Sequence, residues 1–287
     1  ISDVFFFQQG TMPSLDLATG RLLLDGPGSL FLSPNGHGGT LTALSDSGVL
    51  EDLTGRGVRH VFYFQVDNPL VRVGDPKFLG RHVERAAEVS SKIVRKQSPG
   101  EKVGILALVG GRCSIIEYSD LPADVAEERD PSGSLTFHAG SPAIHLFAVD
   151  FLTRITTGAS GLPLHLAKKK VSYFDPVSKT AVNPDEENAL KFERFIFDAL
   201  PLADRWLAVE VEREDEFAPL KNATGPDSWA TVHKAMTGQA AKWLDAAGLD
   251  APPGTPLEVS PLYALDADQF AAKVDKNIVL FGPTYFR

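Results

Sequence analysis

The chain has 287 residues, 43% of them hydrophobic, and a net charge of −9. This length allows one large domain, or one domain and a smaller one, and the hydrophobic content excludes disorder over most of the chain. The negative charge argues against general nucleic-acid binding, because such a surface would repel phosphate backbones, but it does not forbid a nucleotide at one locally cationic site.

The chain contains a single cysteine, Cys113. One thiol cannot form an internal disulfide or a thiolate metal cluster, which fits a reducing compartment, and we expect a cytoplasmic protein. No apolar run approaches the roughly 20 residues of a membrane span. The opening segment "VFFFQQG" is too short, and lacks the basic flank, for a signal peptide. We therefore expect neither a membrane nor a nucleic acid as a partner.

The first elements are read from residues 3–57. "DVFFFQQG" (3–10) predicts a buried strand that ends at Gly10. The stretch 22–40 predicts a loop with short extended pieces, because Pro and Gly recur throughout it. The apolar spacing over 40–57 predicts short helices broken near Gly48.

The middle of the chain continues with strands and helices. "VRHVFYFQVDN" (58–68) predicts a strand, and 75–89 predicts a helix with Asp75 as its N-cap. Two apolar runs flank Gly110 and Gly111, which predicts a hairpin.

The later elements follow the same alternation. Residues 143–156 predict a strand that passes into a helix, and the composition of "ENALKFERFIFDAL" (187–200) favours a helix. Residues 205–213 predict a strand, and 227–248 predict a helix stopped by Gly248.

Strands and helices thus alternate over roughly the first 215 residues. This pattern predicts a mixed α/β sheet with helices on both of its faces. We expect one domain over residues 1–225, followed over 226–287 by a C-terminal helix and a small β-containing region.

Asp67 stands at the end of an apolar strand, where ligands bind in open α/β sheets. A carboxylate there suits a hard cation such as magnesium, which keeps substrate phosphates among its other ligands. The alternative is that Asp67, Asn68 and Pro69 simply form a turn, and the residues alone leave both interpretations open.

The stretch "SPNGHGGT" (33–40) has three glycines before a predicted helix. Glycines let backbone N–H groups approach a base or phosphate, and a helix N-terminus favours anions. The pattern is neither a Walker loop nor a dinucleotide fingerprint, so a flexible loop is the alternative.

Two lysines are candidate ligand-binding residues because of the residues around them in the sequence. Lys191 lies in an apolar stretch, with Phe195 one turn later on the predicted helix. A cation there needs a partner or a ligand, unless its stem carries the ammonium to water. Lys221 follows an acidic turn, so it contacts a phosphate or pairs with Glu214 or Asp215.

Eight blocks occur in order along the chain: FFQQG-x-MP, SPNGHGG, QVDNPL, DPKFLG, EKVG, IIEYSDL, LKFERFIFD and REDEFAPLKNA. With them the chain resembles the UDP-N-acetylglucosamine pyrophosphorylases, within the wider UTP-dependent sugar-1-phosphate uridylyltransferases. The resemblance runs from residue 3 to about 225, and more loosely over 257–265. It implies a mixed, mostly parallel, Rossmann-like nucleotidyltransferase sheet of the GT-A-like kind, with a small C-terminal appendage.

The resemblance also implies a reaction. UTP and N-acetylglucosamine 1-phosphate give UDP-N-acetylglucosamine and pyrophosphate, with Mg²⁺ as cofactor. The sugar phosphate oxygen attacks the α-phosphorus of UTP, which requires alignment of the reacting oxygens and neutralisation of phosphate charge rather than a protein nucleophile.

Individual residues take roles from the family's motifs. Asp67 matches a ligand of magnesium and the nucleotide phosphates, and Lys191 and Lys221 match two lysines that contact phosphates. The other matches are the uridine-binding positions Gln9 and Gly36, the sugar-binding positions Gly104 and Glu117, and the aromatic residues Phe195 and Phe197 on the N-acetyl side.

Two departures concern the sugar. His37 and Ser141 stand where eukaryotic members have asparagines beside the sugar. These changes leave glucose, galactose and N-acetylgalactosamine phosphates open as substrates, so a broad UDP-sugar or UDP-glucose pyrophosphorylase is an alternative.

The third departure concerns the nucleotide. The family's loop, roughly L-x-x-G-G-x-G-T-x-x-G, does not occur in this sequence, and its backbone N–H groups hold the UTP phosphates. We therefore expect negligible turnover by this chain alone, as the later part of a longer enzyme. The alternative is a non-catalytic sugar-nucleotide-binding fragment.

Overall fold

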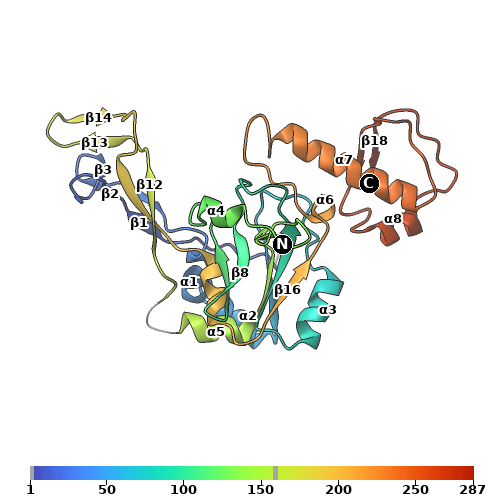
Figure 1. The fold of residues 1–287 in the computed structure, drawn as a ribbon, viewed down its shortest axis with the longest axis horizontal. Coiled ribbons are helices and arrows are strands. Elements are labelled where there is room, and N and C mark those ends of the chain that lie inside the picture. The colour runs from blue at the N-terminus through green and yellow to red at the C-terminus, as the bar shows by residue number, and fades with distance from the viewer. Residues whose placement is uncertain (1–2, 158–160) are drawn as a thin grey trace.

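A computed structural model describes residues 3–157 and 161–287. Figure 1 shows three regions side by side: an arm of small sheets, a central sheet flanked by helices, and a C-terminal region around a long helix. Every helix within the described ranges is too short or too polar to cross a membrane.

The central sheet has seven strands, and neighbouring strands run mostly antiparallel. Its order is β6–β11–β7–β10–β8–β9, and β16 also pairs with β7. Among the described residues, only β7 and β16 pair in parallel within this sheet. The strands are β6 (His60–Tyr63), β7 (Val89–Arg95), β8 (Ile105–Val109), β9 (Arg112–Ile116), β10 (Ala139–Gly140), β11 (His145–Ala148) and β16 (Trp206–Glu210).

The prediction of a mostly parallel sheet is therefore wrong. Parallel neighbours need a crossover of a dozen or more residues, whereas a tight turn reverses the chain. The two residues Gly110 and Gly111 join β8 to β9 as an antiparallel hairpin. Alternation of strands and helices in the sequence does not reveal strand direction.

Helices cover both faces of the central sheet, as predicted. Along β11, Phe147 packs in the core with α1, α2 and α5, whereas its neighbour Leu146 packs against Phe78 of α3 on the other face. This alternation follows from the two-residue period of a strand. The helices are α1 (Gly39–Asp46), α2 (Val49–Gly55), α3 (Pro76–Glu84) and α5 (Val149–Thr156).

Several local predictions are confirmed. Gly48 separates α1 from α2 with a φ of 77°, which glycine adopts without strain. The Asp75 carboxylate accepts a hydrogen bond of 3.0 Å from the Lys77 N–H and caps α3. The stretch 22–40 contains β3 (Leu24–Gly26), β4 (Ser29–Leu30) and β5 (Leu32–Pro34).

Residues 3–10 do not form the predicted strand. They belong to no strand of the described chain, although the Asn35 N–H donates to the Gly10 carbonyl over 3.0 Å, and the side chains of Phe5, Phe6 and Phe7 are exposed. Regular strand structure begins only with β1 (Thr11–Pro13), which pairs with β5.

The predicted helix over 187–200 is also wrong. Residues Ala189–Glu193 form strand β15, and a 3-10 helix, η1, covers Ile196–Leu202. β15 is paired on both sides, with β12 (His165–Lys169) and with β2 (Leu15–Asp16). Pairing with distant segments overrides the favourable helix propensity of Leu, Lys and Glu.

The arm is completed by a four-stranded antiparallel sheet ordered β14–β13–β3–β4. It includes β13 (Tyr173–Asp175) and β14 (Thr180–Val182). Lys191 lies on β15, in the three-stranded sheet β12–β15–β2 of the arm, and not on a helix.

The C-terminal region packs around a core of its own. α7 (Trp229–Ala246) contributes Ala240 and Leu244, which pack with Phe270 and Phe286. The remaining elements are α8 (Ala267–Lys273) and the parallel pair β17 (Leu257–Val259) and β18 (Thr284–Phe286). The expected boundary at 225/226 falls just before α7.

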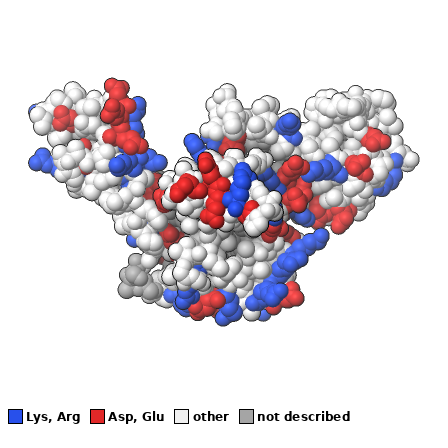
Figure 2. Space-filling model, viewed as in Figure 1, with Lys and Arg blue, Asp and Glu red and all other residues white. Residues whose placement is uncertain are grey.

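Charges of both signs are interspersed over the visible face in Figure 2, with acidic and basic side chains often adjacent. This mixture, together with the net charge of −9, makes this face unsuited to tracking a nucleic-acid backbone.

Two buried histidines, His82 and His145, and the half-buried His37 will make the fold sensitive to acid. Burial lowers the pKa of His37 and His82 to about 4, and that of His145 to about 3. The unfolded chain binds these protons near pH 6.5, so the folded state loses stability as pH falls below that value. Each histidine lowers the free energy of unfolding by up to about 1.4 kcal/mol per pH unit.

Urea denaturation at pH 7, 6 and 5 measures this slope. His82→Gln should make the slope shallower, while the exposed control His233→Gln should leave it unchanged. A free energy of unfolding that stays constant between pH 7 and 5 would contradict the assignment.

Candidate functional site

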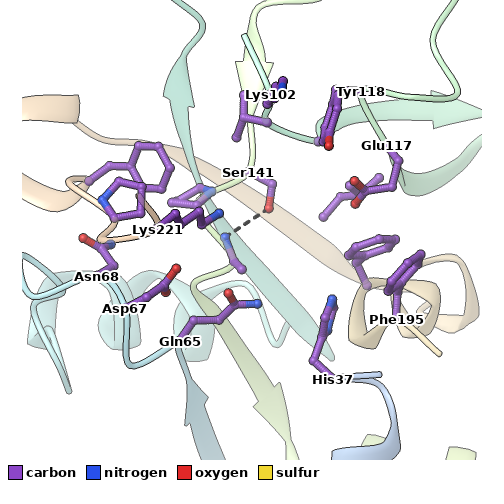
Figure 3. A pocket seen from close by; sticks show the side chains of 18 residues that line it. His37, Gln65, Asp67, Asn68, Lys102, Glu117, Tyr118, Ser141, Phe195 and Lys221 are labelled. Atoms are coloured by element: carbon purple, nitrogen blue, oxygen red, sulfur yellow. Dashed lines mark hydrogen bonds between the residues drawn. The ribbon is translucent and has the colours of Figure 1, made fainter. Parts of the chain in front are cut away.

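A cavity of about 260 Å³ opens at one edge of the central sheet. Its walls come from segments after β6, β9 and β16, from the turn between β10 and β11, from segments before β8 and α1, and from the start of η1. In an antiparallel sheet, the C-terminal end of one strand lies beside the N-terminal end of its neighbour. The pocket therefore gathers residues that lie far apart in the sequence. Figure 3 shows the side chains around this pocket. The lining residues are His37, Gln65, Asp67, Asn68, Lys102, Val103, Gly104, Ile115, Glu117, Tyr118, Ser141, Pro142, Ala143, Phe195, Phe197, Phe217, Pro219 and Lys221.

One side of the pocket, here termed the charged wall, carries Asp67 and Lys221 (Figure 3). The Leu220 N–H donates to the Asp67 carbonyl over 2.8 Å. The Asn68 amide donates to the Glu216 carbonyl over 2.8 Å and accepts from the Ala218 N–H over 3.0 Å. These bonds fasten the segment after α6 (Arg213–Glu216) to the turn that presents Asp67.

The placement of Asp67 differs in detail from the prediction. β6 ends at Tyr63 and lies at an edge of the central sheet as described, so Asp67 lies within a turn beyond this strand rather than directly at its end. The turn is real, because the Asn68 N–H donates to the Gln65 carbonyl over 3.3 Å. The two interpretations of this stretch are therefore compatible: it turns the chain and also presents a carboxylate to the pocket.

The other side, the aromatic wall, consists of His37, Phe195 and Phe197. The His37 ring stacks on Phe195 with centroids 5.3 Å apart, and Phe195 stacks on Phe197 at 5.0 Å. The Ile196 N–H donates to His37 Nδ1 over 3.1 Å. Because a backbone N–H can only donate, Nδ1 carries no proton.

His37 is therefore a fixed hydrogen-bond donor. Burial lowers its pKa to about 4, so the ring is neutral at pH 7. A neutral ring with an accepting Nδ1 carries its proton on Nε2. The side chain presents an N–H beside two aromatic faces.

The glycines before α1 are explained by packing. A Cβ on Gly36, whose φ is 83°, would lie 2.4 Å from the Arg194 carbonyl oxygen. A Cβ on Gly38 would lie 2.7 Å from backbone atoms of Arg194 and Phe195. The Gly38 N–H donates to the Arg194 carbonyl over 2.7 Å. The glycines thus let this loop approach the chain before η1, which places His37 against Phe195.

Gly104 and Glu117 lie together in the pocket. A Cβ on Gly104 would lie 2.9 Å from Ile115 Cγ2 and 3.4 Å from Glu117 Oε1, so glycine leaves room for the carboxylate. Burial raises the pKa of Glu117, and the charge of Asp120 acts in the same direction. Glu117 therefore offers acceptor oxygens in a partly desolvated position.

Ser141 lies between these walls. Its N–H donates to the Gly104 carbonyl over 2.8 Å, and its Oγ accepts from the Ala143 N–H over 3.3 Å. The second bond is drawn as a dashed line in Figure 3. Because Oγ accepts from the backbone, the hydroxyl proton remains available to a ligand.

Three predicted site residues do not line the pocket. Gly36 lies in the loop before α1, and Gln9, which precedes β1, donates from Nε2 to the Gly36 carbonyl over 3.4 Å. Lys191 lies on β15 in the arm, with Nζ 5.6 Å from the centre of the Phe31 ring. The predicted helix face shared by Lys191 and Phe195 does not exist, because the chain is extended there.

Sequence reasoning missed several lining residues that adjoin the predicted ones. Gln65 lies two residues before Asp67, and Phe217 and Pro219 precede Lys221. Lys102 lies two residues before Gly104, and Tyr118 follows Glu117. Their positions inside the recognised blocks were the available signal, but no single one carries a pattern of its own.

The charged wall offers one carboxylate, that of Asp67, to a cation. No group of three or more His, Cys, Asp or Glu side chains within residues 3–157 and 161–287 forms a metal cage. Both polar atoms of the Asn68 side-chain amide are hydrogen-bonded to backbone groups. The side chain that this turn offers to a cation is therefore the Asp67 carboxylate. One carboxylate with phosphate and water oxygens is a usual donor set for Mg²⁺.

The profile of the family described as UTP–glucose-1-phosphate uridylyltransferase matches residues 2–274. UDP-N-acetylhexosamine pyrophosphorylase-like protein 1 of Xenopus tropicalis is 39% identical over 250 residues, covering 86% of this chain and 48% of the relative. UDP-N-acetylglucosamine pyrophosphorylase of Saccharomyces cerevisiae is 36% identical over 280 residues, covering 94% and 58%.

A crystal structure from Entamoeba histolytica, assigned as a UDP-N-acetylglucosamine pyrophosphorylase, has a TM-score of 0.87 and 28% identity. The match covers 98% of this chain and 70% of that one. The chain spans about half the length of the curated relatives it matches.

Proposed function

Because the chain belongs to the UTP–glucose-1-phosphate uridylyltransferase family, we propose that its pocket binds the sugar and phosphate parts of UDP-N-acetylglucosamine. The reaction is the transfer of a uridylyl group from UTP to N-acetylglucosamine 1-phosphate. The observation that carries the proposal is the arrangement of one cavity between a charged wall and an aromatic wall.

The charged wall suits the phosphates. The Lys221 ammonium neutralises phosphate charge and orients the sugar phosphate oxygen. This oxygen attacks the α-phosphorus of UTP, and the bond from that phosphorus to the bridging oxygen of pyrophosphate breaks as pyrophosphate leaves. A magnesium ion bound by Asp67 would supply further charge neutralisation to the phosphates.

The aromatic wall suits an N-acetyl group. An N-acetyl group has a methyl, which packs on aromatic faces, and a carbonyl oxygen, which accepts a hydrogen bond. Phe195 and Phe197 supply the faces, and His37 supplies an N–H donor beside them. Glu117 and Ser141 then serve the sugar hydroxyls. A glucose derivative would leave the His37 donor without this partner.

Isothermal titration of the chain with UDP-N-acetylglucosamine, UDP-glucose and UDP, each with MgCl₂, tests the proposal. We expect UDP-N-acetylglucosamine to bind roughly tenfold or more tightly than UDP-glucose, because the N-acetyl partner of the half-buried His37 donor is missing in the latter. Equal affinities would favour a broad UDP-sugar site. Absence of binding to any UDP-sugar would refute the proposed function.

A further inference from the structure

A buried lysine lies behind the pocket, outside its lining. Lys92, on β7, is 0% exposed, and its Nζ donates over 2.7 Å to Asp75 Oδ2. The same ammonium donates to Glu216 Oε1 and lies 5.2 Å from the centre of the Phe78 ring. Both carboxylates are buried as well. The central strand thus carries a cation enclosed by two acids and an aromatic ring.

Burying such a cluster is not a general means of stabilising a fold. The desolvation of three charges offsets much of their attraction, and apolar residues of similar volume often stabilise as well or better. Glu216 Oε2 is buried with no hydrogen-bond partner in the described structure. Burial raises the pKa of the Glu216 carboxyl, so the Lys92 ammonium is what favours its charged form. A cluster with this cost invites a role beyond stability.

The two carboxylates of the cluster, here termed its Asp75 arm and its Glu216 arm, belong to different elements of the fold. Asp75 is the N-cap of α3, where its second oxygen accepts from the Lys77 N–H. This arm serves the helix on the far face of the sheet. Glu216 is the last residue of α6, directly before the segment that enters the pocket.

The Glu216 arm continues into the charged wall. Its carbonyl accepts from Asn68, Asn68 in turn accepts from the Ala218 N–H, and the Leu220 N–H donates to the Asp67 carbonyl. Figure 3 shows Asp67, Asn68 and Lys221 on the same side of the pocket. An unbroken series of short contacts therefore runs from the buried ammonium to the charged wall.

We propose that Lys92 is a positioning residue, which through Glu216 fixes segment 216–221 so that Lys221 meets the phosphate beside Asp67. The inference rests on the proposed function of the pocket for its ligand. It assigns the Glu216 arm to substrate positioning and the Asp75 arm to stability alone. The two arms predict different consequences for substitutions of equal size and charge.

Glu216→Gln and Asp75→Asn form a matched pair. Each replaces one carboxylate of the cluster by an amide of the same shape and leaves Lys92 with the other carboxylate, and Asn retains capping ability. Both should lower the melting temperature. Only Glu216→Gln should weaken UDP-N-acetylglucosamine binding, by roughly 10- to 100-fold, because small misplacements of aligned groups have effects of this size. Asp75→Asn should leave the dissociation constant within about twofold.

The double variant Glu216→Gln/Lys221→Ala provides a second readout. If Glu216 acts through Lys221, the double variant should bind no more weakly than Lys221→Ala alone, since coupled residues are not additive. Equal losses of affinity in Glu216→Gln and Asp75→Asn, or additive losses in the double variant, would overturn the proposal.

Amide hydrogen exchange tests the positioning without any ligand. The N–H groups of Ala218 and Leu220 should exchange faster in Glu216→Gln than in Asp75→Asn, at equal distance from each variant's melting temperature. Unchanged exchange in Glu216→Gln would overturn the positioning role even if the ligand binds. Faster exchange without ligand binding by the unaltered protein would support the positioning role and refute the proposed function instead.

Discussion

Asp67→Asn will remove the magnesium dependence of UDP-N-acetylglucosamine binding. Asp67 is the carboxylate of the charged wall, and Asn would occupy the same space without the charge. The loss of one charged ligand corresponds to about 1.5–3 kcal/mol, or roughly 10- to 150-fold in the dissociation constant.

Titrations with and without EDTA measure this effect. For the unaltered chain, EDTA should weaken binding by this factor; for Asp67→Asn, binding should already be weak and EDTA should change little. Asp124→Asn, on the exposed helix α4 (Ala123–Ala126), makes the same charge change away from the pocket and should behave as the unaltered chain. If binding by Asp67→Asn still weakened on addition of EDTA, the assignment of the metal to the Asp67 carboxylate would be wrong.

Gly36→Ala will destabilise the fold more than a glycine replacement with the same backbone conformation elsewhere. At a φ of 83° an alanine is strained by roughly 1–2 kcal/mol, and its Cβ would also lie 2.4 Å from the Arg194 carbonyl oxygen. Overpacking of this kind adds roughly 1–3 kcal/mol. The loop would have to move, and His37 would move with it out of contact with Phe195.

Gly28→Ala separates the two causes. Gly28 has a φ of 73° and nothing within 4 Å of an added Cβ, so this variant carries only the conformational strain. Chemical denaturation should therefore show a smaller loss for Gly28→Ala than for Gly36→Ala, and only the latter should weaken binding of UDP-N-acetylglucosamine. Equal losses would mean that the loop shifts freely and that its close approach to Arg194 is unimportant.

Local features of the fold were predictable because their causes are local. The cap at Asp75, the break at Gly48 and the hairpin at Gly110 and Gly111 each depend on a few adjacent residues. Strand direction and the strand around Lys191 were not predictable in this way, since both depend on which distant segments pair.

The pocket shows the same division. Ordered sequence blocks led to Asp67, Glu117 and Lys221, which the fold brings to one cavity. The contact of Lys92 with Glu216 joins residues 124 positions apart, and nothing in either local sequence announces it. Likewise, the proton position on His37 follows from a backbone N–H that lies 159 residues further along the chain.

The hydrogen bonds of Asn68 to Glu216 and Ala218 affect when the pocket can form during folding. The two hydrogen bonds of the Asn68 side-chain amide join residues 148 and 150 positions apart in the sequence. The β8–β9 hairpin, in contrast, closes over two residues. Contacts of such separation pay a large loop-closure entropy before they gain anything, so they form late. A nascent chain can complete the sheet around β11 while the turn at Asp67 is still open. Binding competence therefore arrives only after residue 220 has been made and folded back, close to the end of assembly of the central sheet.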